Sequence, residues 1–145
     1  MNPMQEALAL AREAASRDEV PVGAVILKDG KIIGRGFNLR EERQDPTAHA
    51  EILAITEAAR ALGSWRLIDC ELYVTLEPCP MCLGALQQAR ITRVIYGAAD
   101  PKGGALSLGY RWHEDARSNH RFPVEHAPDA DCSAVLSEFF KAKRK

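Results

Sequence analysis

Strand-like and helix-like segments alternate through the middle of the chain. Residues 71–76, ELYVTL, are rich in β-branched and aromatic side chains, as strands are. Residues 80–90, PMCLGALQQAR, follow as a helix that Pro80 opens, and residues 92–98, TRVIYGA, form a second strand-like run. Two strands joined through a helix pair in parallel, because the helix carries the chain back to the edge at which the first strand began. The alternation therefore predicts an α/β protein whose partly parallel sheet is covered by helices.

The N-terminal part adds a helix and a hairpin. Residues 2–17 are expected to be helical, since Asn2 is a good cap, Pro3 suits the first helical position and apolar residues recur at helical spacing. Residues 20–38 contain two β-rich runs on either side of Asp29 and Gly30. This pair tolerates positive φ angles and favours a two-residue turn. A β-hairpin is thus expected before the parallel unit.

The remaining segments are less regular. Residues 38–48 are polar and contain a proline, so we expect a loop that leads into a helix beginning near His49 and ending at Gly63. Residues 100–121 have mixed charges, several glycines and no clear period. Near the C-terminus, FPVEH is expected to be a short last strand and residues 129–145 a terminal helix.

Length and composition indicate the class of protein. The chain has 145 residues, of which 46% are hydrophobic and 27% charged, as in a soluble globular protein with one domain over residues 1–145. No apolar run approaches the roughly 20 residues that cross a bilayer, and the N-terminus is too acidic for a signal peptide, so we expect a cytoplasmic protein. The net charge of -1 means that a nucleic-acid partner would need a local basic patch.

The four cysteines, Cys70, Cys79, Cys82 and Cys132, occur without secretory features, which argues against a disulfide framework. Cys70 and Cys132 stand alone and are expected to be small buried residues. Cys79 and Cys82 are three residues apart at the start of a helix, where they share one face and the helix dipole favours thiolates. On this spacing alone, a metal clip and a thioredoxin-like redox pair are equally good interpretations.

His49 favours the metal interpretation. Two cysteines and one histidine form a known catalytic zinc set that leaves a fourth position for water. A structural zinc site would need a fourth protein ligand, which Cys70 or His120 could supply through the fold. That alternative would describe a zinc-stabilised interaction domain and not an enzyme.

Glu51 lies two residues after His49 in the segment TAHAEILAI. Successive residues of a helix advance by about 100°, so the two side chains would point to nearly opposite sides unless His49 lies at the helix boundary. Taken alone, a glutamate in a first helical turn is explained by its favourable interaction with the helix dipole. Together with PCPMC it indicates a second role, because a zinc-bound water needs a carboxylate that is not a ligand to move its protons.

HAE followed by PCxxC is the signature of the zinc-dependent cytidine and adenosine deaminase superfamily, which this chain resembles. The closer likeness is to the bacterial adenosine deaminases that act on tRNA, and it extends through EVPVGAVI, DPTAHAEI, WRLIDCELYVTLEPCPMCLGA, RITRVIYGAADPKGG and LSEFFKAKRK. The resemblance implies a cytidine-deaminase-like three-layer fold with a mixed five-stranded sheet between helices. It also implies hydrolytic deamination of adenosine to inosine at wobble position 34 of tRNA, typically the arginine tRNA with anticodon ACG.

The resemblance also assigns roles to residues. It implies that His49, Cys79 and Cys82 hold one Zn²⁺ per subunit and that Glu51 is the proton shuttle. The positions that match family residues around the target nucleotide or along the RNA are Asn38, Asp100, Lys102, Phe140 and Arg144. Without the resemblance, Phe140 and Arg144 would be interpreted as parts of an ordinary terminal helix. The family expectation is a homodimer, with the anticodon loop of tRNA as its partner.

Some features leave other interpretations open. PCPMCLGA also occurs in guanine deaminases that resemble this chain, so a free base or nucleotide is the alternative substrate, whereas DPKGG and FFKAKRK favour tRNA. Residues 105–118, ALSLGYRWHEDARS, are more charged and aromatic than the usual loop of the family, and the resemblance assigns no RNA contact there. His113, His120 and His126 receive no role.

Overall fold

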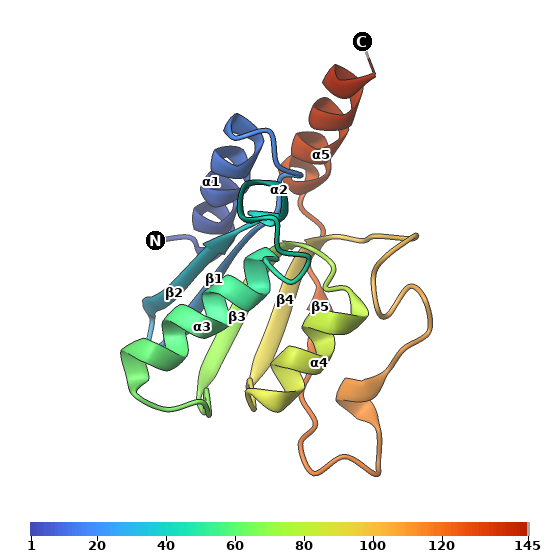
Figure 1. Ribbon diagram of the computed structural model, residues 1–145. Helices are drawn as coiled ribbons and strands as arrows, with labels where there is room; N and C mark the ends of the chain where they lie inside the picture. The colour runs from blue at the N-terminus through green and yellow to red at the C-terminus, as the bar shows by residue number, and fades with distance from the viewer. Residues whose placement is uncertain (145) are drawn as a thin grey trace.

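The computed structural model describes residues 1–144 and contains one mixed β-sheet with helices on both faces (Figure 1). The strands are β1 (Gly23–Lys28), β2 (Lys31–Phe37), β3 (Cys70–Leu76), β4 (Arg93–Ala98) and β5 (Val124–His126). The helices are α1 (Pro3–Ser16), α2 (Arg40–Arg43), α3 (Ala50–Leu62), α4 (Pro80–Gln88) and α5 (Ala130–Lys143), with a 3₁₀ turn at Trp112–Glu114.

The strand order in the sheet is β2-β1-β3-β4-β5. β1 pairs antiparallel with both β2 and β3, whereas β3, β4 and β5 run parallel. The hairpin between β1 and β2 turns at Asp29 and Gly30, whose φ angles are 52° and 75°, as predicted. The parallel pair β3 and β4, joined through α4, is the one predicted from the alternation of strand and helix. A mixed five-stranded sheet between helices is therefore confirmed.

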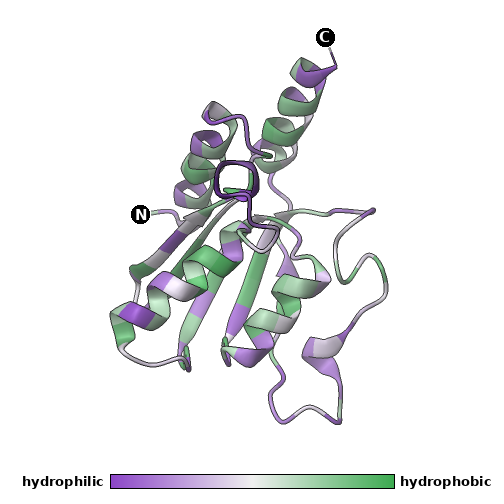
Figure 2. Cartoon of the chain, viewed as in Figure 1, coloured by the Kyte–Doolittle hydropathy of each residue, from purple (hydrophilic) through white to green (hydrophobic). Residues whose placement is uncertain are grey.

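Each face of the sheet has its own hydrophobic core. The core under α1 and α5 includes Leu8, Val25, Ile95 and Cys132. The core under α3 and α4 includes Ala54, Ala58, Leu72, Leu83 and Val94. In Figure 2, β4 is mostly green, whereas α2 at the top of the sheet is purple. Because both faces are covered, β1 and β4, which flank the central strand β3, are nearly continuous buried runs.

Two glycines of β2 allow α3 to lie directly on the sheet. An added Cβ at Gly34 would lie 2.3 Å from the carbonyl oxygen of Ala54, and one at Gly36 would lie 2.2 Å from that of Ala50. No side chain fits at either position unless the backbone of α3 moves. Because Ala50 is the first residue of α3, the contact with Gly36 determines where the N-terminus of this helix lies.

We expect Gly36→Ala to lower the free energy of unfolding by about 1–3 kcal/mol, as overpacking of a tight contact does. Gly84→Ala in α4 is a matched control, because its Cβ would meet nothing closer than the ring of Trp112 at 3.6 Å. Alanine is also the better helix former at that position. Urea denaturation of the two variants measures the difference. Equal stabilities would mean that α3 moves away from β2 without cost.

The segment 38–48, predicted to be a loop, contains the short helix α2. The backbone N–H groups of its second and third residues, Glu41 and Glu42, donate to the carboxylate of Glu19 at 3.0 and 2.7 Å. Glu19 is buried, with 1% of its surface exposed. A cap that comes from a distant residue leaves no local sequence pattern, so the prediction of a simple loop was wrong at this point.

The C-terminal helix follows the prediction closely. The side chain of Asp129 accepts a hydrogen bond from the backbone N–H of Asp131, and α5 continues to Lys143. Lys145, the last residue of the predicted helix, lies outside the described residues. Within residues 1–144, no helix has the length and apolar character needed to cross a membrane.

Candidate active site

His49 and Glu51 lie on the two sides of a helix boundary. His49 is the N-cap of α3, with extended backbone angles φ -78° and ψ 153°, and Glu51 lies in the first turn. The extended backbone at His49 removes the helical rotation that would otherwise separate the two side chains. Both residues line the same cavity. The position of His49 at the boundary, predicted from its spacing to Glu51, is confirmed.

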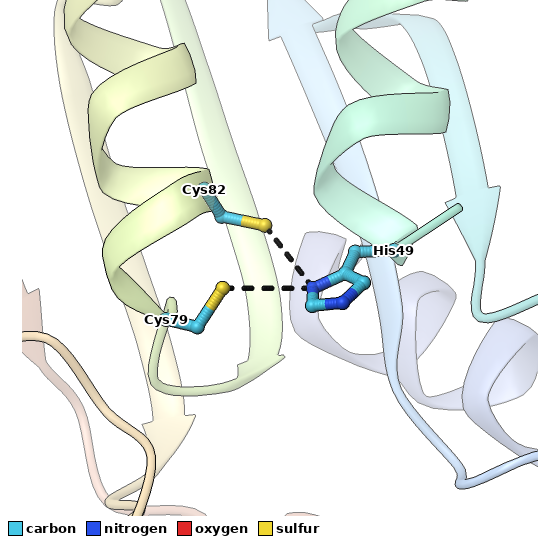
Figure 3. A group of neighbouring side chains, drawn as sticks. All are labelled: His49, Cys79 and Cys82. Carbon is cyan, nitrogen blue, oxygen red and sulfur yellow. Dashed lines mark hydrogen bonds between the residues drawn. The ribbon is translucent and has the colours of Figure 1, made fainter. Parts of the chain in front are cut away.

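Cys79 and Cys82 approach His49 from a second helix N-terminus (Figure 3). β3 ends at Leu76, Cys79 is the N-cap of α4, and Cys82 lies in the first turn. The Nδ1 atom of His49 lies 3.6 Å from Sγ of Cys79 and 3.5 Å from Sγ of Cys82. The N-termini of α3 and α4 therefore converge on three potential ligand atoms.

These three side chains could hold a metal ion, and their geometry suits zinc. Their ligand atoms lie within 4.8 Å of one another. Zn–S and Zn–N bonds of about 2.3 and 2.0–2.1 Å at a tetrahedral angle place sulfur and nitrogen roughly 3.5 Å apart. The two distances from His49 to the sulfur atoms agree with that value. We call His49, Cys79 and Cys82 the ligand group.

No fourth His, Cys, Asp or Glu side chain joins the ligand group in the part of the chain that the structure describes. Cys70 begins β3, whereas Cys79 follows the end of that strand. The Nε2 atom of His120 is 2.7 Å from the carbonyl oxygen of Ile91. Both residues suggested as a fourth ligand are thus placed elsewhere, and one metal position would remain open.

Hydrogen bonds within the ligand group separate the pKa values of its members. The pKa of Cys79 is lowered to about 4, first by the hydrogen bond from Cys82 and then by contact with His49. The pKa of Cys82 is raised, because this thiol donates the hydrogen bond and is buried. The hydrogen bond to Cys79 raises the pKa of His49. The group thus contains a thiolate and exchangeable protons, which a divalent cation would displace.

Glu51 is almost completely buried, with 4% of its surface exposed. Burial raises the pKa of its carboxyl group to about 7, because the charged form loses its hydration. A carboxyl group with a pKa near neutrality can both accept and donate a proton, which suits general acid-base catalysis. Glu51 is not a member of the ligand group.

The ligand group opens into a cavity of about 250 Å³. Pockets for drug-sized ligands are larger, at roughly 300–1,000 Å³, so this cavity suits a single base. Residues from several elements form its wall, and those used below are Asn38, Arg40, His49, Glu51, Glu77, Cys79, Asp100 and Gly103. Arg40 and Glu77 were missed by the sequence analysis. The position of Glu77, directly before PCPMC, was the one available signal.

Asn38 and Asp100 reach the cavity wall, and local hydrogen bonds hold both. Nδ2 of Asn38 donates to a backbone carbonyl at 3.2 Å, and its Oδ1 accepts from the N–H of Arg40. Oδ1 of Asp100 accepts from the N–H groups of Lys102 and Gly103 at 3.2 and 3.1 Å. The structure therefore brings these two predicted substrate contacts to the same cavity as the ligand group.

Lys102, Phe140 and Arg144 are exposed and lie outside the cavity wall. Phe140 is 43% exposed, and its ring contacts that of Phe139 edge-on, with centroids 5.4 Å apart. Arg144 follows the last residue of α5. Contacts from these residues require a substrate that extends beyond the cavity.

The remaining cysteines and two of the remaining histidines contribute to packing. Cys70 and Cys132 are buried free thiols, as predicted. His113 is 2% exposed, and burial lowers its pKa. The ring of His126 stacks on Tyr96, with centroids 4.8 Å apart. None of these side chains lines the cavity at the ligand group.

The sequence profile of the MafB19-like deaminase family matches residues 1–144, so the chain belongs to a deaminase family, the class that its fold and ligand group define. Within this class, the tRNA-specific adenosine deaminase of Bacillus subtilis (strain 168) is 47% identical over 143 residues, which cover 98% of this chain and 89% of that protein. The chain is therefore a member of the family of tRNA-specific adenosine deaminases and is an enzyme.

Solved structures support this membership. One from a study of A-to-I editing by tRNA:A34 deaminases at the wobble position of transfer RNA is 46% identical, with a TM-score of 0.86, and the match covers 92% of this chain and 98% of that one. A guanine deaminase from Bacillus subtilis is 35% identical, with a TM-score of 0.66, over 100% of this chain and 96% of that one. Deaminases with different substrates thus share the fold.

Proposed function

We propose that this protein deaminates adenosine to inosine at wobble position 34 of tRNA, with the arginine tRNA of anticodon ACG as substrate. The observation that carries the proposal is the buried Glu51 beside the ligand group, at a cavity for one base. The identity with tRNA-specific adenosine deaminases supports the choice of tRNA. We further propose that residues 1–145 form a single domain and that the enzyme is cytoplasmic, where tRNA is available.

In this proposal the ligand group holds one Zn²⁺ per subunit. Bound there, zinc would act as a Lewis acid and lower the pKa of a water toward about 7. Glu51 accepts a proton from the attacking water and delivers it to a ring nitrogen of the purine while the oxygen adds to C6. Glu51 then passes the second proton to the amino group, the C6–N bond breaks and ammonia leaves. One water is consumed, and Glu51 returns to its initial state.

The shape of the site favours an unpaired base. An adenine inside a duplex cannot reach the bottom of a cavity, whereas a loop base needs little energy to unstack and turn outward. Asn38 and Asp100 are proposed to hold the ribose or the backbone beside the target base, and Lys102 a phosphate. Phe140 and Arg144 would stack on a neighbouring base and pair with a phosphate outside the cavity.

Free guanine is the alternative substrate, because a guanine deaminase shares the fold. Ammonia release measured side by side on an anticodon stem-loop with A34, on guanine and on CMP separates the possibilities. We expect turnover of the stem-loop only, since the contacts outside the cavity require a polynucleotide. Turnover of guanine with the stem-loop untouched would establish the alternative.

Removing residues 141–145 should weaken RNA binding in a salt-dependent way. The segment carries Lys141, Lys143, Arg144 and Lys145. The logarithm of the binding constant falls linearly with the logarithm of the salt concentration. Each lost phosphate contact should make this slope shallower by about 0.7–0.9. Lys143 pairs with Asp18, so we expect fewer lost contacts than lost charges. Fluorescence anisotropy with the stem-loop measures the slope. An unchanged slope, with zinc retained, would mean that this segment does not contact RNA and only ends the C-terminal helix.

We propose a homodimer as the functional form. Exposed apolar side chains occur on α4 and on the loop that packs against it, namely Met81, Leu108, Tyr110 and Trp112, which are 37–49% exposed. A contiguous patch of exposed apolar side chains marks an interaction site, and the rings of Tyr110 and Trp112 lie together with centroids 5.4 Å apart. Light scattering at micromolar concentration should give twice the mass of one chain, and a monomer would contradict the proposal.

A further inference from the structure

Glu77 is a buried carboxylate that the deamination chemistry does not use. It lies between the end of β3 and Cys79, with 3% of its surface exposed. It does not belong to the ligand group. Within residues 1–144, no lysine, arginine or histidine side chain forms an ion pair with it. A buried carboxylate without a counter-ion needs hydrogen bonds to compensate for lost hydration.

Those hydrogen bonds come from a single loop, residues 100–107. Oε1 of Glu77 accepts from the backbone N–H of Asp100 at 3.1 Å and from the hydroxyl of Ser107 at 2.7 Å. Oε2 accepts from the backbone N–H of Ser107 at 2.8 Å. One carboxylate therefore holds both ends of the loop.

Gly104 shows how closely the loop surrounds this carboxylate. A Cβ added at Gly104 would lie 2.1 Å from the carboxyl carbon of Glu77, so a larger residue there would displace this carboxylate from the loop. The N–H of Gly104 donates to the carbonyl of Asp100, and the N–H of Ala105 donates to the carbonyl of Pro78, both at 2.8 Å. The loop is thus wound around the segment that connects β3 to Cys79.

This loop also forms part of the cavity wall. Asp100 and Gly103 line the same cavity as Glu51 and the ligand group. The backbone of Asp100 is held by Glu77, and its side chain is held by the N–H groups of Lys102 and Gly103. Glu77 thus ties the segment that carries Cys79 to the wall that carries Asp100.

We propose that Glu77 is a positioning residue for the RNA substrate. It holds loop 100–107 so that Asp100 faces the cavity and seats the target nucleotide in front of the ligand group. Its own oxygens are engaged by Asp100 and Ser107, so it acts through the loop and not on the reacting atoms. The inference rests on the proposed function, because it assigns Asp100 a contact with RNA.

The kinetic test is a double-mutant cycle on the stem-loop substrate with zinc-loaded protein. Glu77→Gln keeps the shape but turns an amide N–H toward the N–H groups of the loop. We expect it to raise KM about tenfold, as the loss of one hydrogen bond from a charged group to the substrate does, with kcat changed less than about threefold and zinc retained. In an Asp100→Asn background, the same substitution should raise KM by less than about threefold, because the two residues act through one contact. Gly104→Ala, which drives a methyl group into the carboxylate, should reproduce the kinetics of Glu77→Gln.

Two results would overturn the inference. The first is that the fold-increases in KM of Glu77→Gln and Asp100→Asn multiply when the two substitutions are combined. The second is that Glu77→Gln lowers kcat and leaves KM unchanged. Should Glu77→Gln fail to fold, Ser107→Ala removes only one hydrogen bond to Glu77 and should raise KM in the same direction. An unchanged KM would then count against the proposal.

A second readout does not depend on activity. The backbone amide of Ser107 donates to Glu77, so its hydrogen exchange, followed by NMR in the full chain, should be at least about tenfold faster in Glu77→Gln. Unchanged exchange would refute the role of Glu77 in holding the loop. If the wild-type protein does not act on RNA, the proposed function fails while this measurement still tests the loop, so the two failures are distinguishable.

Discussion

Glu51→Gln is expected to lower kcat for the stem-loop by about 10²–10⁴-fold, the range that a general acid-base group contributes. Glutamine has nearly the same volume and remains uncharged, so it fits the buried position. It can neither take a proton from the attacking water nor deliver one to the purine. Because Glu51 is not in the ligand group, the zinc content should stay at one ion per subunit. Single-turnover deamination and metal analysis of the same preparation measure both quantities.

Glu57→Gln is the matched control for this variant. Glu57 is exposed on the same helix, α3, and accepts a hydrogen bond from the N–H of Arg35. It should keep its activity and its zinc. A Glu51 variant that is zinc-free, or that retains activity within about tenfold of the parent, would remove Glu51 from the role of proton carrier.

Cys82→Ala is expected to lose both the metal and thermal stability. The ligand group joins the N-termini of α3 and α4, so a metal bound there would contribute to the free energy of folding. A metal at a hundredfold excess over its dissociation constant stabilises a protein by about 2.7 kcal/mol, which corresponds to roughly 5–10 °C in melting temperature for a chain of this size. Scanning calorimetry of the zinc-loaded parent and the variant measures this difference.

Cys132→Ala separates the loss of the metal from the loss of a buried sulfur atom. Cys132 is fully buried in the core under α1 and α5 and is not in the ligand group. Its replacement should lower stability without any loss of zinc. If Cys82→Ala melts at the temperature of the parent, or keeps its zinc, the ligand group has been assigned wrongly.

The parts of the fold that depend on local pattern were predictable. The alternation over residues 71–98 predicted the parallel pair β3 and β4, and Asp29 and Gly30 predicted the hairpin turn. The start of α3 followed from the spacing of His49 and Glu51, because only a helix boundary lets both side chains face one site. In each case, the physical cause lies within a few residues of the element that it determines.

Features that depend on distant contacts were not predictable. Helix α2 is capped by Glu19, more than twenty residues earlier in the chain, so residues 38–48 were predicted to be a loop. Likewise, the hydrogen bonds of Glu77 to the loop 100–107 exist only once β3 and β4 have brought these segments together. The sequence identifies Glu77 as a neighbour of PCPMC but does not indicate its partners.

The candidate site falls between these two cases. The CxxC spacing of Cys79 and Cys82 indicated a metal clip or a redox pair, and the fold then placed His49 within 3.6 Å of both sulfur atoms. For Phe140 and Arg144, the structure supplies exposed positions on or next to α5 but no contact with the cavity. Their contacts with RNA stay a prediction, which is based on the family resemblance alone.

The most direct test of the central claim is the position of inosine in RNA treated with the zinc-loaded protein. Transcripts of the arginine tRNA with anticodon ACG, digested and analysed by mass spectrometry, should contain inosine at position 34. The same transcript with its anticodon loop paired to a complementary oligonucleotide should contain none, because a stacked adenine cannot enter the cavity. Absence of inosine in the free transcript, together with conversion of free guanine to xanthine by the same preparation, would contradict the account.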